Sequence, residues 1–591
     1  MRQISSLALS FCLLLISSTA LGQSLAESSF KALERYMVTQ ERVPNPTRRV
    51  YSIRVNNQSD LGIINDSIRN AIKRGDKTIE VQLAPGVFYY DRLALYLYNI
   101  NDKDVSISIQ GDHTVLIAAG KDYVRGGLVA PFDRNNLYFD QNKEEVNYYG
   151  NVQKTLTKVE VLNTTTKECR VKVGGNIRYT PGLCIQLSEW FHCPVYEVTK
   201  INDGYVYFKA GDLSYDKAKK CYNVQYDNAI GSVNPRVRFI NPDLVRERNS
   251  AIHECSVAQF LILYKMKLKS FTISGIRFLG CANASEALMY FRDVEAETIC
   301  LQDCQFERLN NLICNLKNTG NFVFKGNEVK DCYYGALNSA VDCSNTIVKD
   351  NSFYRTGKGW TNGSVVACHG ANFVVSGNKF NDFGYSAIST GYNHKWGSKR
   401  VTSGVIENNE ICYGEEYFSN CDNYTIMDVG AVYISTLSDK IIVRYNYIHD
   451  YCGVRSNRAI YCDDGAMNVK IYGNVICNIP GAHAVFSWRA NNVIRTVSGS
   501  NDGIEFFYNI IWGTYKMDER PKSSCIHGKN LILYAKGEEA PKNELINFKY
   551  QEKDLVFSGA AMSEGKLVIP QSALRDLQQF PTYEKMRQWL K

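Results

Sequence analysis

A repeating unit in the second half of the chain constrains the fold more than any other feature of the sequence. Each unit has a run of alternating apolar residues, a turn residue that is usually Asn, one polar residue and an apolar anchor, as in FVFKGNEV and VKIYGNVI. The anchors follow one another at intervals of 23 to 37 residues and are Phe278, Phe306, Val329, Phe353, Phe380, Ile411, Ile448, Ile476 and Ile511. Periods of about 20–50 residues indicate an architecture of stacked units.

Asn occupies the same place in seven of the units, at Asn327, Asn351, Asn378, Asn409, Asn446, Asn474 and Asn509. An Asn amide can hydrogen-bond to its copy in the next unit, and Asn tolerates left-handed turns. The units hold short strands and no helical pattern, which excludes the helical solenoids. The sequence therefore predicts an all-β fold, a right-handed parallel β-helix over residues 271–515, in which the Asn residues form one line and stacking buries a continuous core.

The N-terminus has the features of a secretory signal peptide over residues 1–22. An early Arg2 precedes an apolar run, residues 7–16, and small residues follow up to Gly22. We therefore expect an exported protein, periplasmic or extracellular. No later stretch approaches the roughly 20 apolar residues of a membrane-spanning helix, so we expect no transmembrane segment.

Two segments separate the leader from the main repeats. Residues 23–122 predict an N-terminal cap and the first rungs of the β-helix, with an amphipathic helix over 61–74 that has Asp60 as its N-cap. Residues 123–242 lose the repeat pattern and become strand-rich with irregular turns. We interpret them as an inserted β-rich domain packed against the β-helix.

The rest of the chain divides into a long and a short part. Residues 243–535 predict the main parallel β-helix, which carries the functional groove. Residues 536–591 predict a C-terminal tail or cap with two short helices, broken at Pro581 because proline cannot continue a helix.

Composition excludes several classes of function. The formal charge is +8, and no Lys/Arg run stands out, so we expect no nucleic acid partner. The 19 Cys residues include Cys12 in the leader, form no CxxC pair and show no zinc-type spacing. We interpret them as small buried hydrophobic residues rather than as a full set of disulfides, and we expect no metal and no cofactor.

The stretch AIYCDDGAMNVKIYGN carries two adjacent acids, Asp463 and Asp464, at the end of an alternating apolar run. It aligns with AVYIS over 431–435 and AVFSW over 484–488 as three successive strands. Side chains alternate between the two faces of a strand, and neighbouring strands lie about 4.8 Å apart. With the aliphatic residues inward, the outer face presents two rows of side chains: Tyr433, Tyr461 and Phe486 in one, and Ser435, Asp463 and Trp488 in the other.

This outer face has the residue types of a sugar-binding groove. Aromatic rings stack on pyranose faces, and two carboxyl groups are the minimal set for most glycoside hydrolysis. A second acid nearby raises the pKa of the first, which makes a general acid at neutral pH. The alternative is a plain turn for the acids and ordinary strand positions for the aromatic residues.

Three further polar residues are candidate substrate contacts. His449 precedes Asp450, so a satisfied turn pair is its alternative role. His483 opens the strand after the acid pair, where a surface position is the alternative. Arg489 follows Trp488 in the next rung.

Residues 428–476 contain the pattern DVGAVYIS, IIVRYNYIHD, AIYCDD and YGN in that order. The pattern resembles that of glycoside hydrolase family 141, a family of secreted right-handed β-helix proteins of the pectate-lyase-like kind with α-L-fucosidase and xylanase activities. The resemblance implies a glycan substrate and paired aspartates as acid/base or nucleophile. By motif position these carry over to Asp428 and to the pair Asp463 and Asp464. The next rung departs from the pattern: it reads HAVFSWRANN where a Gly-rich loop with an Arg is expected, and there only Arg489 and Asn491 or Asn492 fit.

Three functional classes are consistent with these features. The first is a glycoside hydrolase that acts as a monomer on an oligo- or polysaccharide. The second is a polysaccharide lyase, in which the three aspartates would hold Ca²⁺ and Arg455, Arg458, His483 or Arg489 would supply the base. The third is a non-catalytic glycan-binding β-helix. The motif favours the hydrolase.

Overall fold

The structure is a computed structural model of the 591-residue chain. It describes residues 50–57, 62–90, 93–118, 159–172, 184–188, 195–210, 212–216, 221–225, 236–240, 259–281, 287–309, 312–330, 332, 334–357, 364–383, 385–391, 401–414, 430–451, 458–463, 466–479, 483–487, 503–513, 516–517, 526–540, 544–545 and 549–591. The expected signal peptide, residues 1–22, lies outside these ranges.

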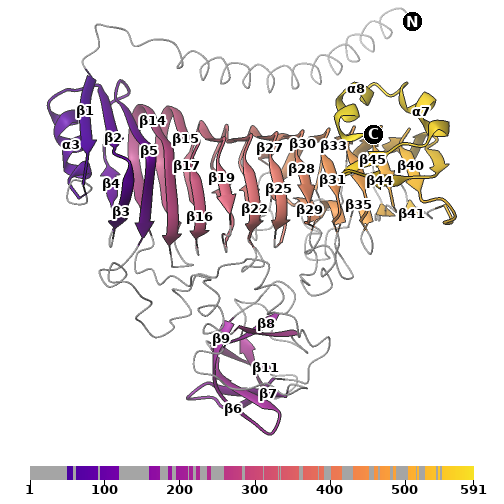
Figure 1. Ribbon diagram of the computed structural model, residues 1–591, viewed down its shortest axis with the longest axis horizontal. Helices are drawn as coiled ribbons and strands as arrows, with labels where there is room; N and C mark the ends of the chain where they lie inside the picture. The colour runs from indigo at the N-terminus through magenta and orange to yellow at the C-terminus, as the bar shows by residue number, and fades with distance from the viewer. Residues whose placement is uncertain are drawn as a thin grey trace, which may run out of the picture.

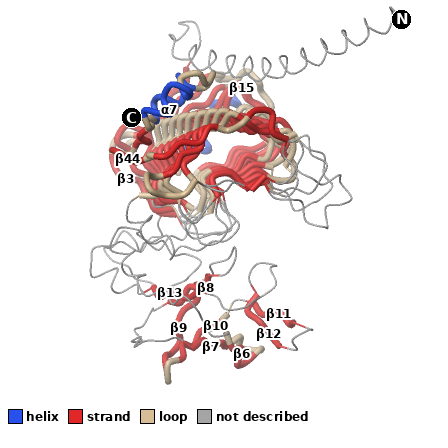
Figure 2. Tube along the Cα trace, turned by 90° about the vertical axis from the view of Figure 1, so that its right-hand side faces the viewer, coloured by secondary structure: helices blue, strands red, loops and turns tan. Residues whose placement is uncertain are grey.

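The repeats form three columns of parallel strands, and the chain visits columns A, B and C in turn before it returns to A one rung further on (Figures 1 and 2). Column A contains β17 (Cys314–Thr319), β20 (Leu337–Ser339), β23 (Val366–Cys368), β26 (Ile388–Thr390), β29 (Gly430–Ile434), β32 (Arg458–Cys462), β35 (His483–Ser487), β38 (Lys516–Met517) and β41 (Glu544–Leu545).

Column B contains β18 (Phe322–Lys325), β21 (Ile347–Lys349), β24 (Phe373–Ser376), β27 (Thr402–Glu407), β30 (Ser438–Arg444), β33 (Val469–Tyr472), β36 (Glu505–Phe507), β39 (Ile526–Gly528) and β42 (Lys549–Glu552). Column C contains β16 (Gln305–Leu309), β19 (Glu328–Lys330), β22 (Ser352–Thr356), β25 (Lys379–Phe383), β28 (Glu410–Cys412), β31 (Tyr447–His449), β34 (Val475–Cys477), β37 (Ile510–Trp512), β40 (Leu531–Tyr534) and β43 (Leu555–Ser558). The expected parallel β-helix is confirmed.

The first rungs are built from longer strands that bend from one column into the next. These are β1 (Val50–Val55), β2 (Thr78–Leu83), β3 (Gly86–Tyr90), β4 (Leu95–Tyr98), β5 (Ser106–Ala118), β14 (Leu261–Cys281) and β15 (Met289–Gln302). Strand β14 pairs with β4 in column A and with β5 further along its length, so the rungs before and after the inserted segment are direct neighbours.

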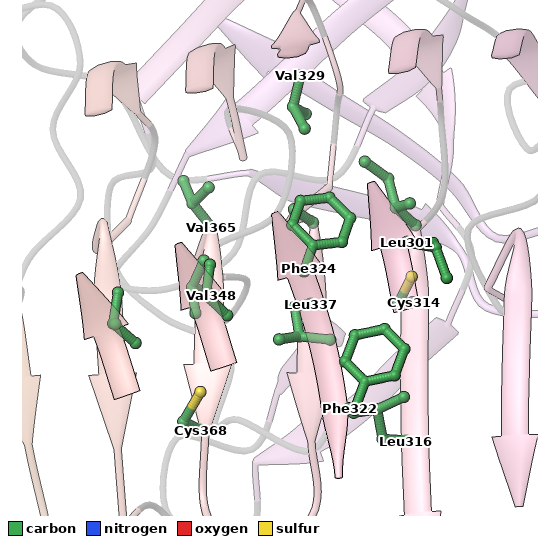
Figure 3. Close-up of a cluster of buried hydrophobic side chains, with 14 of the residues drawn as sticks. Leu301, Cys314, Leu316, Phe322, Phe324, Val329, Leu337, Val348, Val365 and Cys368 are labelled. Atoms are coloured by element: carbon green, nitrogen blue, oxygen red, sulfur yellow. The ribbon is translucent and has the colours of Figure 1, made fainter. Parts of the chain in front are cut away.

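The core of the β-helix is the set of inward side chains from all three columns. Phe322, Phe324 and Leu337 are completely buried and lie among side chains from neighbouring rungs (Figure 3). The anchors stack in line along column C; the rings of Phe353 and Phe380, for example, have centroids 4.7 Å apart and planes 14° apart. Ten cysteines among the described residues are buried and free of disulfides, in agreement with their interpretation as small hydrophobic residues.

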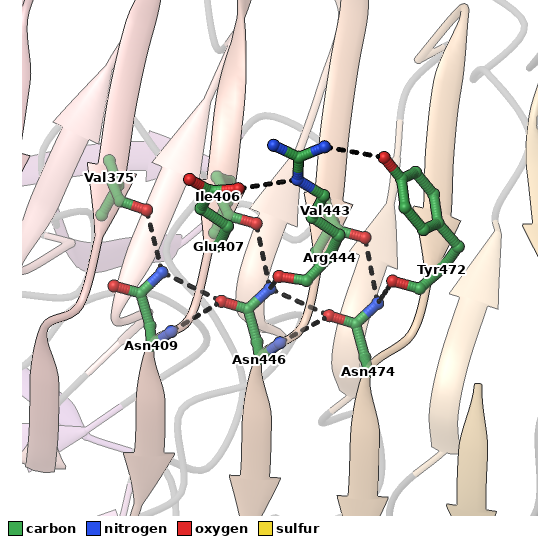
Figure 4. A network of polar contacts seen from close by, with 9 residues as sticks. All are labelled: Val375, Ile406, Glu407, Asn409, Val443, Arg444, Asn446, Tyr472 and Asn474. Atoms are coloured by element: carbon green, nitrogen blue, oxygen red, sulfur yellow. Dashed lines mark hydrogen bonds and ion pairs between the residues drawn. The ribbon is translucent and has the colours of Figure 1, made fainter. Parts of the chain in front are cut away.

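A ladder of asparagines fixes the register of the rungs at the turn between columns B and C (Figure 4). From Asn351 onward, the Oδ1 atom of each Asn accepts hydrogen bonds from the backbone N–H and the side-chain amide of the preceding Asn; Asn446 accepts both from Asn409, at 3.1 and 2.9 Å. The seven expected asparagines all take part, and the ladder continues to Asn530 and ends on Asp554. The single line of Asn residues is therefore confirmed, with two members that the sequence analysis missed.

The left-handed turn lies one residue earlier than the sequence analysis expected. The residue before the ladder position has a positive φ, as at Gly377 (68°), Asn408 (54°) and Tyr445 (59°), while none of the ladder asparagines does. The Asn is therefore selected for the hydrogen bonds of its amide and not for a left-handed backbone.

The described strands of the inserted segment pair only with one another. A six-stranded antiparallel sheet contains β13 (Arg236–Ile240), β8 (Cys184–Ser188), β9 (Val195–Asn202), β10 (Tyr205–Lys209), β7 (Glu168–Lys172) and β6 (Glu160–Asn163), and β11 (Asp212–Asp216) pairs with β12 (Cys221–Gln225). In Figures 1 and 2 these strands lie to one side of the columns and add no rung to them.

Both ends of the β-helix carry helices. At the N-terminal end α3 (Ile64–Lys73) buries Ile64, Ile68 and Ala71, but its N-cap is Ile63, which makes no side-chain cap; the expected cap Asp60 lies outside the described residues. At the C-terminal end α7 (Gln571–Leu577) and α8 (Tyr583–Met586) flank Pro581 as expected, with a 3₁₀ turn at Arg587–Trp589 and a hairpin of β44 (Ala561–Ser563) and β45 (Lys566–Val568).

The boundary expected at residue 535 differs from the observed one. Parallel pairing continues through β41, β42 and β43, so the rungs end at Ser558. The anchor position continues through Ile532, which pairs in register with Ile511, and through Val556, which pairs with Ile532. The expected boundary was therefore placed too early in the chain.

Candidate functional site

Strands β29, β32 and β35 lie side by side in column A in the expected register. Tyr433 pairs with Tyr461, and Tyr461 pairs with Phe486. Val432 and Ile460 belong to the main core, whereas Tyr433 and Tyr461 form a separate cluster of two rings. The alternation therefore places both tyrosines on the outer face of the column.

The two rings share the row that the alignment predicts, but they do not stack face to face. Their centroids are 5.2 Å apart and their planes are nearly perpendicular, at 83°. Tyr433 is 4 % exposed and Tyr461 is 2 % exposed. Alternation predicts which face a side chain takes, but not what covers that face, and here both rings are covered.

Asp463 lies beside this pair and is nearly buried, with 4 % of its surface exposed. Its backbone N–H bonds to the carbonyl of Ile434 at 2.7 Å, which continues the strand pairing by one residue. The phenol of Tyr433 donates a hydrogen bond of 2.7 Å to its Oδ2 atom. A carboxyl group so little exposed is costly unless it is hydrogen-bonded, and Tyr433 supplies one such bond from the rung before.

Arg458 adds a positive charge to the same strand. It is 8 % exposed, and its guanidinium carbon lies 4.4 Å from the centroid of the Tyr461 ring. This cation–π contact places a cation, two phenols and a carboxylate on neighbouring strands. Arg458 was expected only as a candidate base of the lyase alternative. Strict alternation assigns Arg458 and Tyr461 to opposite faces of the strand, so the sequence pattern held no signal for this contact.

Ser389 and Ser435 extend the outer face of column A with small polar groups. Ser389 pairs in register with Tyr433 and is 6 % exposed. Ser435 is fully buried, and its Oγ lies 3.1 Å from the hydroxyl of Thr436. Ser435 was expected in the same row as Asp463, whereas Ser389 was not among the predicted site residues.

Several predicted site residues lie outside the described residues or have undescribed side chains. Asp428, Asp464, Trp488 and Arg489 belong to the first group. The backbone of β35 places Phe486 opposite Tyr461, as the alignment predicts, and His483, the first residue of the strand, opposite Arg458.

His449 lies apart from these residues, on the outer face of column C. Its Nδ1 is 2.8 Å from Asp450 Oδ2, and its Nε2 is 3.4 Å from Glu410 Oε1. Burial lowers the pKa of His449, but its hydrogen bonds to Asp450, Cys412 and Glu410 outweigh that effect and raise the pKa to about 11. The imidazole is thus a cation between two carboxylates at neutral pH.

The neighbours of His449 tie column C to the C-terminal cap. The ring of Tyr447 stacks on the imidazole with centroids 4.1 Å apart and on Trp589 at 5.3 Å. The Tyr447 hydroxyl donates a 2.7 Å hydrogen bond to the carbonyl of Gly565. These contacts support the turn-pair role that the sequence analysis kept as an alternative for His449.

The described side chains form no candidate metal site. Among the described residues, no group of three or more His, Cys, Asp or Glu side chains is arranged to hold a metal ion. Asp428 and Asp464, which the lyase alternative needs, lie outside that set.

Comparisons with known proteins give no family. No family model and no curated protein matches the chain. Among solved structures, one titled "Glycoside hydrolase" has a TM-score of 0.40 at 10% identity and covers 90% of this chain and 99% of that one. A surface protein and adhesin of Streptococcus pneumoniae has a TM-score of 0.37 at 9% identity, over 84% and 96% of the two chains. A complex of XylC with xylose has a TM-score of 0.34 at 11% identity, over 88% and 77%.

These similarities are too weak to carry an activity to this chain. One further observation bears on its environment: none of the helices in the described part of the chain is long and apolar enough to cross a membrane.

Proposed function

We propose that the protein is a glycoside hydrolase and that Asp463 is one of its two catalytic carboxyl groups. The observation that carries the proposal is the nearly buried Asp463, hydrogen-bonded by Tyr433 at 2.7 Å on the outer face of column A. Nearly buried carboxyl groups in polar, aromatic surroundings are a recurrent feature of sites that transfer protons. Asp464 and Asp428 are the candidates for the second carboxyl group.

Tyr433 has a positioning role in this proposal. Its hydroxyl holds the Asp463 carboxylate in one orientation from the neighbouring rung, and the rigid column holds both backbones. Glycoside hydrolysis needs one carboxyl group to protonate the leaving oxygen and another to act as nucleophile or to activate water. A carboxyl group held in one rotamer can meet the glycosidic oxygen in a fixed geometry, which lowers the entropic part of the barrier.

Arg458 is the proposed polar neighbour of Asp463, and the Tyr461 ring holds its guanidinium in place. Because Tyr433 and Tyr461 meet edge to face and are both covered, we assign the sugar contact to the polar groups around Asp463 and not to a ring face. Within this class the motif pattern of the sequence favours fucosyl or xylosyl linkages in a complex polysaccharide. We further propose that the protein is exported, since its N-terminal residues form a signal-peptide pattern.

A panel of plant and host polysaccharides tests the proposal. Purified protein should release reducing sugar from at least one of them, and the release should persist in the presence of a chelator. Products that absorb in the ultraviolet, together with loss of activity on chelation, would instead show the eliminative reaction of a lyase. Binding without any released product would show a non-catalytic glycan-binding protein, and either result would overturn the proposal.

A further inference from the structure

A second polar groove lies several rungs before Asp463, at the turn that joins column A to column B. Its volume is about 730 Å³, and it is lined by residues of the first rungs from Asn99 to Asn345. Its walls come from the residues after β4, from the middle of β14 and β15 where these strands bend from one column into the next, from the end of β17 and from the turn after β20. The site around Asp463 shares none of these residues.

The groove arises from a stack of left-handed turns. Asn99, Lys265, Asp293 and Asn318 occupy equivalent positions on successive rungs, and their φ angles are 55°, 51°, 55° and 46°. A left-handed residue turns the backbone sharply outward from the strand. Four such turns in line produce a continuous trough along the axis of the β-helix.

The polar groups in the trough are held in fixed orientations. The side-chain amide of Asn318 donates to Asp293 Oδ1 at 2.8 Å, and its backbone N–H donates to Asp342 Oδ1 at 2.8 Å. One rung further on, the Asn345 amide donates to Asn321 Oδ1 at 2.8 Å. The trough is therefore a rigid surface of amide and carboxylate groups, and such a surface needs little ordering when a ligand binds.

The charged side chains that line the trough are Lys265, Lys267, Asp293, Glu295 and Asp342, two positive and three negative. Lys267 Nζ lies 3.2 Å from Glu295 Oε2, and Asp293 Oδ2 lies 3.7 Å from Nε of Arg292, which is outside the lining. These paired groups offer many hydrogen-bond donors and acceptors, and the small negative balance of the lining gives no net attraction for an anion. This lining therefore favours a neutral polyhydroxylated ligand over an anionic one.

Two tyrosines lie on the outer face of column A just before the groove lining begins, and the guanidinium carbon of Arg69 lies 4.0 Å from the centroid of the Tyr98 ring. Tyr96 and Tyr98 are 38% and 39% exposed, and their rings lie 4.9 Å apart. Tyr98 is followed directly by Asn99, which lines the groove. Exposed rings beside fixed amides and carboxylates are the combination that binds a sugar, because the apolar face of a pyranose covers the ring while its hydroxyl groups reach the polar wall.

We propose that this groove is a second, non-catalytic carbohydrate-binding site that takes a segment of a neutral polysaccharide. The proposal rests on the proposed function only for the choice of carbohydrate as the ligand class. The groove and Asp463 also lie along the same edge of column A. Five steps in register connect Leu316, next to the groove, with Cys462, next to Asp463. At about 4.8 Å per step the separation is about 24 Å, so only a polymer could reach both sites.

Binding is tested with the Asp463→Asn protein, so that no substrate is consumed. Native-gel affinity electrophoresis uses neutral xylan, mannan and β-glucan as probes, with polygalacturonate as the anionic comparison. The double variant Asn101→Ala/Glu295→Ala removes two exposed side chains from the groove lining. We expect it to weaken binding of the neutral polymer at least tenfold. The matched variant Glu328→Ala, at an exposed position on column C, should bind as before.

Three results would overturn the inference: no neutral polymer binds, polygalacturonate alone binds, or the double variant binds as tightly as its parent. A kinetic measurement separates this inference from the proposed function. In the active protein, Asn101→Ala/Glu295→Ala should raise KM for the polymer while leaving kcat, and turnover of short oligosaccharides, unchanged. If the protein releases sugar and Asn101→Ala/Glu295→Ala changes neither binding nor KM, only the proposed second site is contradicted. If the polymer binds and the double variant weakens that binding, but no sugar is released, only the proposed hydrolase activity is contradicted.

Discussion

Asn446 Oδ1 accepts two hydrogen bonds from Asn409, one from its backbone N–H and one from its side-chain amide. The Asn446 amide in turn donates to the carbonyl of Ile406 at 3.0 Å and to Asn474 Oδ1 at 2.9 Å. Each ladder residue thus satisfies backbone groups that the turn would otherwise leave buried and unpaired. Each ladder residue also provides the side-chain oxygen that accepts the hydrogen bonds of the ladder residue before it, so the loss of one residue affects two rungs.

The variant Asn446→Ala should therefore destabilise the protein by about 1–3 kcal/mol, because it leaves buried partners unsatisfied on two rungs. Chemical unfolding followed by circular dichroism measures the change. The matched variant Asn338→Ala loses one partly buried contact with Asn315 and should change stability by less than about 0.5 kcal/mol. If Asn446→Ala and Asn338→Ala unfolded at the same midpoint concentration of denaturant, a structural role for the ladder would be contradicted.

Gly377 has a positive φ of 68°, and a Cβ atom there would come within 2.4 Å of Asp350 Oδ1 on the previous rung. Neighbouring rungs accept Asn408 and Tyr445 at this left-handed position, so backbone strain alone does not demand glycine. We expect Gly377→Ala to lower stability by about 1 kcal/mol or more, since strain and contact add. Adding Asp350→Ala should recover part of the loss. A double variant no more stable than Gly377→Ala would show that the contact is unimportant.

The repeat could be predicted from the sequence because one rung resembles the next. The spacing of Asn and anchor predicted one stacked rung per unit and the line of asparagines, and the alignment of AVYIS, AIYCD and AVFSW predicted the observed pairing of Tyr433 with Tyr461. Asn530 and Asp554 escaped notice because the strands before them are short and irregular. Asp554 ends the ladder for a chemical reason: a carboxylate accepts hydrogen bonds but has no amide proton to pass on.

Two features of the site could not be predicted from strand patterns. Whether Tyr433 and Tyr461 are exposed depends on what packs over them. The alternation of residues along a strand indicates only on which face of the strand a side chain lies. His449 follows β29 and precedes β32 in the chain, yet it belongs to column C, on another side of the β-helix. Closeness in sequence to the acid pair therefore did not mean closeness in space.

The charged His449 should stabilise the C-terminal cap in a pH-dependent way. Its pKa rises from 6.5 to about 11 on folding, so its contribution is complete below about pH 6.5 and is lost as the pH rises toward 11. The melting temperature of His449→Gln should fall below that of the wild type at pH near 6, and the gap should shrink as the solution becomes alkaline. His113→Gln, at an exposed position, is the control. A gap that stays constant over this range would contradict the cationic state of His449.

Removing the Tyr433 hydroxyl should impair catalysis more than folding. A hydrogen bond to a charged group contributes about 1.5–3 kcal/mol, so Tyr433→Phe should reduce kcat by roughly 10- to 100-fold. Tyr472→Phe loses a 3.0 Å hydrogen bond with Arg444 on column B and serves as the control with normal turnover. Equal turnover of the two variants would exclude Tyr433 as a positioning residue.

The most direct test of the central claim is the rate of reducing-sugar release by Asp463→Asn on the best polysaccharide of the panel. Thermal melting checks that the variant is folded, and Asp576→Asn in α7 provides a matched change of charge away from the site. The loss of a group that transfers a proton should lower kcat by about 10²–10⁴-fold, while Asp576→Asn keeps the wild-type rate. Wild-type turnover by a folded Asp463→Asn protein would show that Asp463 is not a catalytic residue.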